Sequence, residues 1–443
     1  MPDDKKLALT RVDVWEPKIG DPIPHRPRVN TPIQTIILRK QVQQWLAKNV
    51  IEPITLAAYF NNLVFVAKKN GDTRVCVDCT PVNAVTDDYD WPLPSLQDFR
   101  HNLGGARWFA RLDLKDAFFR ISVPANLRVY TSFRCDGKQY QFRRMPFGLK
   151  TAPSTFQRFM DTHLAPLSNI CFWYIDDILI HGETLSQLRT RVAWVKETLR
   201  ATECEINEEK SEYEKQALSF VGMQVYAGGL APNANQVRKV LDTPPPTSKV
   251  AAQSALGLVS YLRDFIPLIS HFTSLLYPDK QGLRLSPSEY GKEWRRLMGH
   301  LASAVVSLRH WKTGMDSDVY TDASGTGLGA ILIQDRQVVA LASRQLTPAE
   351  TRYSATDREH LALTFVAQKF KIFLHQNQAI TRVHSDHKAL LTRKSGDLTP
   401  RQARWKAKTD YWIPNLLHVK GKDNPADFVS RWSVEIKGGA MKT

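Results

Sequence analysis

Periodic apolar positions divide the first half of the chain into a helix and a long mixed segment. The first thirty residues are irregular and rich in proline, and helical periodicity runs through residues 35–48. Short strands, turns and helices then alternate as far as about Gly229. This part is predicted to be one large mixed α+β region.

Helical periodicity returns after a proline-rich joint. The sequence DTPPPT at residues 242–247 predicts a semi-rigid extended linker. Helices are expected at 250–265 and 293–308, with a loop at 279–291 between them. This stretch is predicted to be a helical bridge.

The last part of the chain has a new pattern. From Asp318 on, VYTDASGTGLGAILI predicts a strand, a turn and a second strand, followed by helix and strand to about Trp432 and a disordered tail. This pattern indicates a smaller α/β domain. A chain of 443 residues is long enough for two or three such domains, and no internal repeat is visible.

The charge balance narrows the class of partner. The 60 Lys and Arg residues against 44 acidic residues give a formal net charge of +16 and a pI near 9.6. The excess is spread along the chain, which is more typical of a protein that binds a polyanion than of a merely solvated basic surface. Nucleic acid is therefore the expected partner.

Cysteine usage and hydropathy argue against other classes. The five cysteines are an odd, sparse set, so a disulfide framework is not expected and a reducing compartment fits. Cys76 and Cys79 form a C-x-x-C, but no second Cys or His pair follows at zinc-site spacing. The N-terminus has no apolar signal core and nowhere do 18 apolar residues run together, so no membrane partner is expected.

Two adjacent acids stand inside the apolar run CFWYIDDILI at residues 171–180. The pattern predicts a β-hairpin whose turn carries Asp176 and Asp177. Solvated turn acids are the plainer alternative, but two like charges between apolar strands are costly to bury unless a cation neutralises them. Asp113, in the apolar strand WFARLDL, offers a third carboxylate. Three carboxylates that meet could hold two Mg²⁺ roughly 4 Å apart for phosphoryl transfer, although spacing alone does not bring Asp113 to Asp176.

Four further acids follow in the C-terminal part: Asp322 in VYTDAS, Glu359 in TDREHLAL, Asp386 in VHSDHKAL and Asp427 in NPADFVSR. Each also has a structural explanation. Asp322 could end a strand, Asp386 could cap the next helix, and Thr356 with Glu359 has the spacing of a capping box. Asp427 would lie in the first turn of a helix, where a negative charge interacts favourably with the helix dipole.

Several segments together resemble the reverse transcriptases of gypsy-type LTR retrotransposons. YIDD is similar to their Y-x-D-D box, and LDLKDAFF to the motif with the first catalytic Asp. The fingers segment is similar to VAKKNGDTRVCVD, and the segment after the first motif is similar to MPFGLKTAPSTFQRFM. The primer-grip hairpin is similar to FVGMQVYAGGLAPN, and the first thumb helices are similar to ALGLVSYLRDFIP. The four C-terminal acids, with TDAS and SDHKAL, resemble the metal site of ribonuclease H.

The resemblance covers about residues 30–432 and implies an α+β fold, a right-hand polymerase of fingers, palm and thumb followed by an α/β ribonuclease H-like domain. It implies an N-terminal extension at 1–34, fingers and palm at 35–231, thumb and connecting helices at 232–315, a ribonuclease H domain at 316–433 and a tail at 434–443.

The resemblance also implies roles for individual residues. Seven acids are expected to be catalytic and to bind metal, two Mg²⁺ or Mn²⁺ at each site: Asp113, Asp176, Asp177, Asp322, Glu359, Asp386 and Asp427. The nucleotide would contact Lys68, Lys69, Arg74, Leu114, Phe118 and Phe147, and the primer grip would comprise Phe220, Val221, Gly222 and Met223. Arg74 with Lys68 or Lys69 would bind the triphosphate. Phe118 would exclude a ribose 2′-hydroxyl, its alternative being a core residue.

Three positions depart from wider patterns. Phe147 stands where retroviral enzymes carry Gln, and Phe is the residue that gypsy-type enzymes have at this position. Thr80 replaces the Arg of V-D-Y-R-x-L-N, which puts that residue's support of the fingers in doubt. The loop His that many ribonucleases H place before the last Asp is missing, and His418 lies on the strand side of that segment, so the group that assists product release is not identified.

The implied function is RNA- and DNA-templated DNA synthesis together with cleavage of the RNA strand of RNA–DNA hybrids, for retrotransposon replication. The implied partners are RNA–DNA hybrid, DNA duplex, dNTPs, a tRNA-like or other primer and, as for other enzymes of this type, a second copy of the chain. The expected location is the cytoplasm, within virus-like particles, or the nucleus.

The sequence disfavours two other functions. One is a domesticated derivative that binds nucleic acid without catalysis, which the seven intact acids disfavour. The other is a DNA-templated or telomerase-like polymerase, which the ribonuclease H segment disfavours. No protease or integrase motif is visible, so the chain is expected to be one product or fragment of a polyprotein.

Overall fold

The structure, a computed structural model, describes residues 14–15, 17–21, 26–55, 57, 59–67, 71, 73–88, 91–94, 102–267, 269–377, 380–392 and 398–426. The chain divides into two compact units, the first comprising Met1–Ser95 and Phe109–Lys215 and the second Leu96–Trp108 and Gln216–Thr443. Lys68, Lys69 and Asp427 lie outside the described residues, as does the predicted tail.

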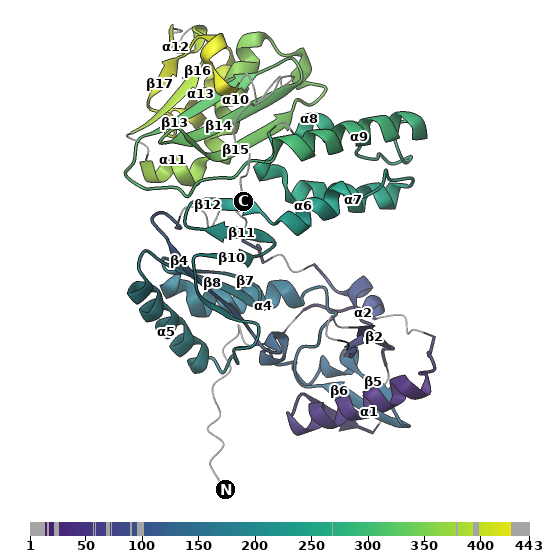
Figure 1. Ribbon diagram of the computed structural model, residues 1–443. Helices are drawn as coiled ribbons and strands as arrows, with labels where there is room; N and C mark the ends of the chain where they lie inside the picture. The colour runs from purple at the N-terminus through teal and green to yellow at the C-terminus, as the bar shows by residue number, and fades with distance from the viewer. Residues whose placement is uncertain are drawn as a thin grey trace. The chain divides into compact units, whose positions relative to one another are not determined.

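Helix α1 (Pro32–Ala47) opens the first unit and carries Trp45 into an aromatic core (Figure 1). It begins at Pro32 rather than at residue 35 because Thr31 and Gln34 form a capping box. The ring of Trp45 packs edge-on against Phe142 and Phe133, with centroids 5.1 and 5.9 Å away. Burial of these rings joins the helix to the adjacent sheet.

Two small antiparallel sheets complete the N-terminal part of this unit. One has the order β1-β6-β5, formed by β1 (Ile51–Ile54), β6 (Lys138–Phe142) and β5 (Phe133–Cys135). The other is the hairpin of β2 (Leu63–Ala67) and β3 (Thr73–Val77), followed by the short helix α2 (Thr80–Val85).

A four-stranded sheet of order β7-β8-β4-β9 carries the first group of predicted acids. Its strands are β4 (Trp108–Asp113), β7 (Cys171–Tyr174), β8 (Asp177–Gly182) and β9 (Glu212–Lys215). Helix α5 (Leu185–Ala201) packs against β8, and α4 (Ala152–Leu164) precedes the hairpin; the 3-10 turns are η2 (Ala117–Arg120), η3 (Arg128–Thr131) and η4 (Ala165–Leu167).

The predicted hairpin is present, with Cys171 paired to Ile180 and Tyr174 to Asp177. One detail of the prediction was wrong. Asp177 is the first residue of β8, so the turn consists of Ile175 and Asp176. A turn of two residues leaves only one of the two acids at its tip.

The second unit contains a small sheet followed by helices. The sheet is formed by β10 (Ala217–Phe220), β11 (Met223–Tyr226) and β12 (Gly229–Pro232), and the helices are α6 (Ala234–Leu241), α7 (Lys249–Tyr261), η5 (Arg263–Phe265), α8 (Ile269–Thr273) and α9 (Pro287–Ala304). The helices share a core with Trp294 and Leu256 fully buried. Part of the loop predicted at 279–291 is helical, because Ser286 and Glu289 form a capping box that starts α9 at Pro287.

A five-stranded mixed sheet forms the rest of the second unit, in the order β15-β14-β13-β16-β17. Its strands are β13 (Ser317–Ala323), β14 (Gly327–Gln334), β15 (Gln337–Gln345), β16 (Thr381–Ser385) and β17 (Leu416–His418). Helix α10 (Ala355–Lys369) packs against β13 and β14 over a core that includes Val319, Leu332 and Val383. The remaining elements are η6 (Glu350–Arg352), α11 (Lys371–Asn377), α12 (Ala389–Thr392), α13 (Pro400–Thr409) and η8 (Gly421–Asp423).

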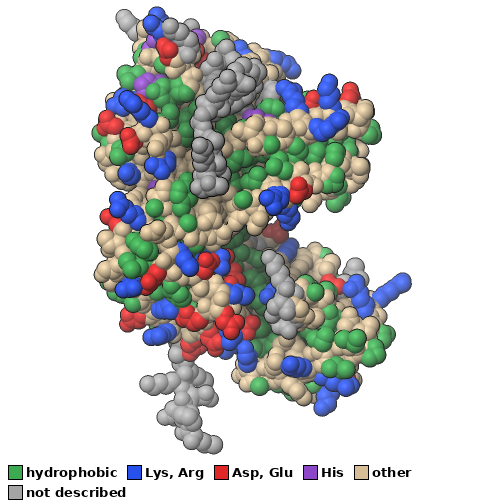
Figure 2. Space-filling model, in the orientation of Figure 1, with side chains coloured by type: hydrophobic (Ala, Val, Ile, Leu, Met, Phe, Trp, Pro, Cys, Tyr) green, Lys and Arg blue, Asp and Glu red, His purple; other side chains and the backbone are tan. Residues whose placement is uncertain are grey.

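The surface carries charges of both signs. Figure 2 shows Lys and Arg side chains distributed over the visible face of each unit, as expected from the net charge of +16. In the described part of the chain, no helix is long and apolar enough to cross a bilayer.

Candidate active sites

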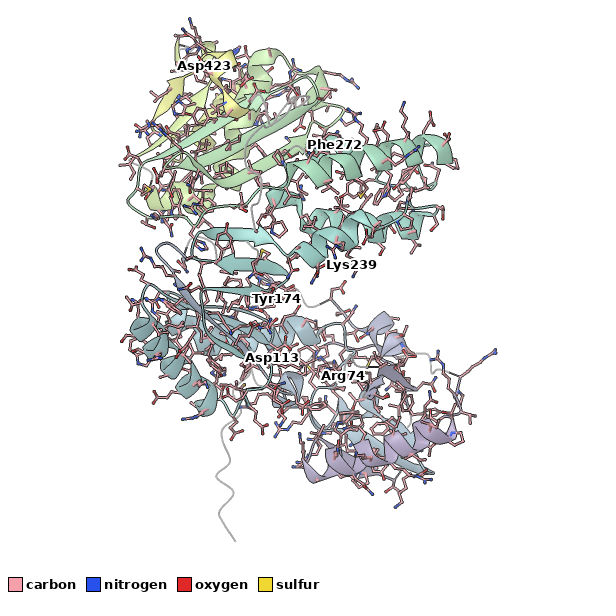
Figure 3. All side chains as sticks on the ribbon, in the orientation of Figure 1. Arg74, Asp113, Tyr174, Lys239, Phe272 and Asp423 are labelled. Carbon is pink, nitrogen blue, oxygen red and sulfur yellow. The ribbon has the colours of Figure 1, made fainter. Side chains whose placement is uncertain are left out.

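Asp113 and the hairpin turn meet because β4 lies beside β8 in the sheet (Figure 3). The amide of Leu114 donates a 3.1 Å hydrogen bond to the carbonyl oxygen of Asp176. On the other side, the amide of Asp113 donates to Oγ of Ser211 at 3.2 Å. The end of β4 is thus tied to the turn and to the segment before β9. Asp113 and Asp176 both line a cavity of about 720 Å³.

The carboxylates of this first site repel one another. Burial, and then the charge of Asp176, raise the pKa of Asp177 to about 6. Burial also raises the pKa of Asp176, and the charge of Asp113 adds to it. The Nζ atom of Lys210 lies 3.7 Å from Oδ1 of Asp113 and offsets part of this charge. A cluster of half-buried carboxylates with one nearby ammonium suits divalent cations, so the donor set fits the implied metals.

The cavity contains three of the described residues predicted to contact a nucleotide, namely Arg74, Leu114 and Phe147. The guanidinium carbon of Arg74 lies 5.2 Å from the centre of the Phe147 ring, a cation–π distance. Phe118 does not line the cavity. Its ring packs on Phe147 at 5.0 Å and on Phe156 at 5.8 Å.

Other lining residues were missed from the sequence. They come from α1, from the segment after β4 and from the segment before β9: Gln41, Trp45, Lys115, Asp116, Phe119, Asn207 and Lys210. Lys115 and Asp116 stand inside LDLKDAFF, so the motif itself could have indicated them. The sequence around Asn207 and Lys210 has no motif that predicts a site, because these residues reach the cavity only through the tertiary fold.

Thr80, which stands where the family usually carries an arginine, contacts Asp78. The hydroxyl of Thr80 donates a 2.7 Å hydrogen bond to Oδ1 of Asp78. The guanidinium of Arg28 lies 3.8 Å from the other oxygen of the same carboxylate. Asp78 is therefore held by a hydroxyl of its own segment and by an arginine from the N-terminal part of the chain.

The residues predicted to grip the primer form a tight hairpin in the second unit. Phe220 and Met223 are buried and pair across a turn in which Val221 and Gly222 have φ angles of 44° and 72°. The hydroxyl of Tyr261 donates to the carbonyl oxygen of Val221, and a Cβ atom on Gly222 would lie 2.6 Å from that hydroxyl. Glycine at this position is required both by its φ angle and by the close approach of α7.

The second group of acids converges at the end of β13. Asp322 lies near the end of β13, Asp386 follows the parallel strand β16, and Glu359 comes from α10, which packs on the sheet. One ligand oxygen from each lies within 4.8 Å of the others, and within the described residues this is the only such group of three. Asp322 and Glu359 are 1% and 6% exposed.

The three side chains of this second site carry like charges at close range. Burial, and then the charges of Asp322 and Asp386, raise the pKa of Glu359 to about 8. The hydroxyl of Ser385 donates to Oε2 of Glu359 at 3.5 Å. Three converging carboxylates, two of them buried, are the donor set that hard divalent cations prefer, so the implied metals fit here too.

The structure removes two of the alternative explanations for these acids. Ser354, not Thr356, caps α10 and accepts from the amide of Asp357, so the capping box expected at Thr356 and Glu359 is not formed. Helix α12 begins at Ala389, which leaves Asp386 outside its cap. His418 lies in β17, as predicted, and is exposed there. The side chain of Asp386 is 3.1 Å from where a Cβ atom on Gly421 would stand.

Two segments of the chain match known protein families. Residues 66–225 match the family "Reverse transcriptase (RNA-dependent DNA polymerase)", and residues 314–410 match the "RNase H-like domain found in reverse transcriptase". The Pol polyprotein from transposon gypsy of Drosophila melanogaster is 30% identical over 417 residues, which are 89% of this chain and 40% of that protein. The Tf2-3 transposon polyprotein of Schizosaccharomyces pombe is 30% identical over 388 residues, 83% of this chain and 28% of that protein. The chain thus spans about two fifths or less of these relatives.

Solved structures share the fold. A foamy viral protease–reverse transcriptase in complex with double-stranded DNA has a TM-score of 0.75 at 18% identity, covering 92% of this chain and 73% of that one. The same type of protein in complex with an RNA/DNA hybrid has a TM-score of 0.71 at 18% identity, covering 96% of this chain and 58% of that one. The predicted α+β fold, polymerase followed by ribonuclease H-like domain, is confirmed. The chain belongs to the reverse transcriptases with a ribonuclease H domain that gypsy-type LTR retrotransposons encode.

Proposed function

We propose that the chain synthesises DNA on RNA and DNA templates and cleaves the RNA strand of RNA–DNA hybrids during retrotransposon replication. The observation that carries this proposal is the presence of two separate carboxylate sites. One is formed by Asp113 and the Tyr174–Asp177 turn, and the other by Asp322, Glu359 and Asp386. Each has the donor set for divalent cations within a family-matched segment.

In the first site, Asp113, Asp176 and Asp177 would hold two divalent cations, with Mg²⁺ proposed and Mn²⁺ as the alternative. When bound, these cations would activate the attacking oxygen and stabilise the leaving oxygen. Arg74, with Lys68 or Lys69, would donate hydrogen bonds to the triphosphate. Leu114, Phe118 and Phe147 would shape the sugar pocket, and the hairpin of Phe220, Val221, Gly222 and Met223 would position the primer end.

In the second site, Asp322, Glu359 and Asp386 would be joined by Asp427. These carboxylates would hold the cations against the RNA strand of a hybrid. The functional division is proposed as fingers and palm at 35–231, thumb and connecting helices at 232–315 and ribonuclease H domain at 316–433. The proposed partners are hybrid, duplex, dNTPs, a tRNA-like or other primer and a second copy of the chain, in the cytoplasm within virus-like particles or in the nucleus.

Primer extension on RNA and on DNA templates with Mg²⁺, together with cleavage of a hybrid labelled in its RNA strand, tests the proposal. Asp176→Asn should abolish extension and leave hybrid cleavage largely intact, because Asp176 and Asp322 belong to different units. Asp322→Asn should have the opposite effect. Asp242→Asn, which removes an exposed acid outside both sites, is the matched control.

The outcome separates the alternatives. A folded parent chain that binds hybrid but has neither activity would be an inactive nucleic-acid-binding derivative. Extension on DNA but not on RNA templates would indicate a DNA-templated polymerase. Loss of both activities in folded Asp176→Asn would contradict the assignment of two independent sites.

A further inference from the structure

The side chain of Asn83, in α2, forms two hydrogen bonds with the backbone of one loop. Its Nδ2 donates to the carbonyl oxygen of Gly148 at 2.8 Å, and its Oδ1 accepts from the amide of Lys150 at 2.8 Å. A carbonyl oxygen can only accept and a backbone N–H can only donate, so these partners determine the orientation of the Asn83 amide. One side chain thus holds the loop at two points.

This loop is not part of a regular element. Residues 145–150 follow β6 and precede α4, and they belong to neither a helix nor a strand. At its start the amide of Met145 donates to the carbonyl oxygen of Ile121, and at its end the amide of Ala152 donates to that of Leu149. Between these points, Asn83 supplies hydrogen bonds of the kind that a neighbouring strand would supply.

Gly148 brings the loop close to the end of β3. It has a φ of 107°, and a Cβ atom at this position would lie 2.8 Å from the carbonyl oxygen of Val77. Glycine is required here by both the backbone conformation and the close approach. The loop therefore lies against the last residue of β3, and Asn83 comes from α2, the helix that follows this strand.

The same strand and the same loop contribute to the cavity that Asp113 and Asp176 line. Arg74 of β3 and Phe147 of the loop also line this cavity, with the guanidinium carbon 5.2 Å from the ring centre. Phe147 directly precedes Gly148, so the hydrogen bonds of Asn83 fix the backbone next to this ring. A displaced loop would change the distance between the Phe147 ring and Arg74.

We infer that Asn83 is a positioning residue for nucleotide binding. It holds the loop against β3 and α2 and so fixes Phe147 relative to Arg74, although it is not itself among the residues that line the cavity. This inference rests on the proposed function, in which Arg74 binds the triphosphate and Phe147 shapes the sugar pocket. A site whose walls are held in place before the ligand arrives binds more tightly, because fewer groups lose freedom on binding.

Titration of dATP into the full chain bound to a primer–template with Mg²⁺ measures this affinity directly. A primer that ends in a dideoxynucleotide prevents the reaction. Asn83→Ala removes both hydrogen bonds, adds no charge and suits a helix, since alanine has the highest helix propensity. It should raise the Kd of dATP about ten-fold.

Pre-steady-state incorporation of dATP on an extendable primer separates positioning from folding. The rate at saturating dATP should change less than about two-fold in Asn83→Ala, because binding rather than the chemical step is affected. The burst amplitude gives the active fraction of the protein. A lower amplitude with the Kd of the parent would mean that Asn83 only supports folding, and it would overturn the inference.

Asn83→Asp keeps the test valid if Asn83→Ala does not fold. It has nearly the same shape and retains an acceptor for the amide of Lys150, but it sets a carboxylate oxygen against the carbonyl oxygen of Gly148. It should also raise the Kd of dATP. Asn235→Asp makes the same chemical change at an exposed position of α6 and should bind dATP like the parent.

A double-mutant cycle with Phe147→Ala tests whether Asn83 acts through the Phe147 ring. In the Phe147→Ala background, Asn83→Ala should raise the Kd less than about two-fold, because residues that act through one another are not additive. A ten-fold effect in both backgrounds contradicts the inference, as does an unchanged Kd in folded Asn83→Ala.

The two measurements also keep this inference separate from the proposed function. A parent chain that extends primers, but whose affinity for dATP does not depend on Asn83, contradicts the inference alone. A parent chain that binds dATP through Asn83 and Phe147 but extends no primer contradicts the proposed polymerase alone. A parent chain that binds no dATP contradicts both.

Discussion

Gln157 holds the turn that carries Asp176 by accepting a 2.8 Å hydrogen bond at Oε1 from the amide of Ile175. Ile175 has a φ of 56°, a left-handed conformation that is costly for a β-branched residue. Gln157 is fully buried in α4, and its Nε2 donates to Oδ1 of Asp161 at 2.7 Å. Two indole groups, from Trp173 and Trp91, donate to the same carboxylate at 2.6 and 2.5 Å. A part-buried network of hydrogen bonds thus fixes a strained residue beside Asp176.

Gln157→Leu should therefore lower the rate of DNA synthesis roughly ten-fold or more, because small displacements of positioned catalytic groups are expensive. The substitution leaves the Ile175 amide without its acceptor at a cost of about 1–3 kcal/mol. Hybrid cleavage should be unchanged, since its acids belong to the other unit. Single-turnover primer extension and hybrid cleavage on the same preparations measure the two effects.

The matched control is Gln187→Leu, which removes a partly exposed glutamine that accepts from the amide of Glu183 at the start of α5. It should lower neither activity. Equal loss of synthesis in the two variants, or full synthesis by a folded Gln157→Leu, would show that the bond to Ile175 does not position the turn.

Phe118→Ala should allow ribonucleotides to be incorporated about ten-fold more readily, because it removes the ring on which Phe147 packs and opens the wall of the cavity. Incorporation of rNTP and dNTP at a single template position gives the ratio. Phe119→Leu is the comparison, since Phe119 lines the same cavity and also packs on Phe142. Unchanged discrimination between rNTP and dNTP in Phe118→Ala would make Phe118 a core residue. Relaxed discrimination in Phe119→Leu alone would mean that Phe119, not Phe118, excludes the ribose 2′-hydroxyl.

The sequence was sufficient to predict the hairpin of β7 and β8, because two acids in an otherwise apolar run have few other solutions. It was not sufficient to bring Asp113 to Asp176. Their proximity depends on β4 lying between β8 and β9, which are later in the chain, and no local pattern encodes this strand order. The family resemblance supplied what periodicity could not.

The first residues of helices were also not predictable from local sequence alone. The spacing of Thr356 and Glu359 satisfied the rule for a capping box, yet Ser354 is the cap, because the helix begins one residue before Thr356. In α9, Ser286 and Glu289 satisfy the rule, although the pattern around them predicts a loop. The cap motif is local, but the burial of Tyr290 and Trp294 in the helical core decides which residues continue it.

The metal-free protein should lose stability as the pH rises from about 4.5 to about 8, because of Glu359. Its folded-state pKa of about 8 lies above the ordinary value of 4.5, so the folded protein binds the extra proton in this range. Below this range Glu359 is protonated in both the folded and the unfolded state, and its contribution to stability is constant. Above this range the folded state bears the full cost of the buried charge, about 5 kcal/mol. Thermal unfolding in EDTA between pH 5 and 8.5 measures the slope.

Glu359→Gln removes this titration and should raise Tm at pH 8 more than at pH 5. Asp335→Asn, at an exposed turn between β14 and β15, should leave the difference between the two pH values as in the parent. Mg²⁺ should restore stability to the parent at pH 8 and do little for Glu359→Gln. An unfolding profile of Glu359→Gln parallel to that of the parent would mean that Glu359 is not the titrating group.

Binding of an RNA–DNA hybrid should weaken steeply with salt, because a polymerase holds phosphates and sugars rather than base edges. Each contact should contribute about −0.9 to the log–log slope, so about five to eight contacts lower the affinity roughly a hundred-fold or more between 50 and 200 mM salt. Arg238 and Lys239 are exposed in the last turn of α6, and Lys239→Ala should reduce the slope by about one if it contacts a phosphate (Figure 3).

Duplexes of equal length and different sequence are the control for this prediction. Affinity should vary little among them at any one salt concentration, since the net charge of +16 acts on every phosphate alike. Lys239→Ala should weaken binding to all of them to the same extent, because a phosphate contact carries no sequence information. A shallow slope together with strong sequence preference would instead mean that base edges supply the binding energy, and the basic surface would then belong to a sequence-specific DNA-binding protein rather than to a polymerase.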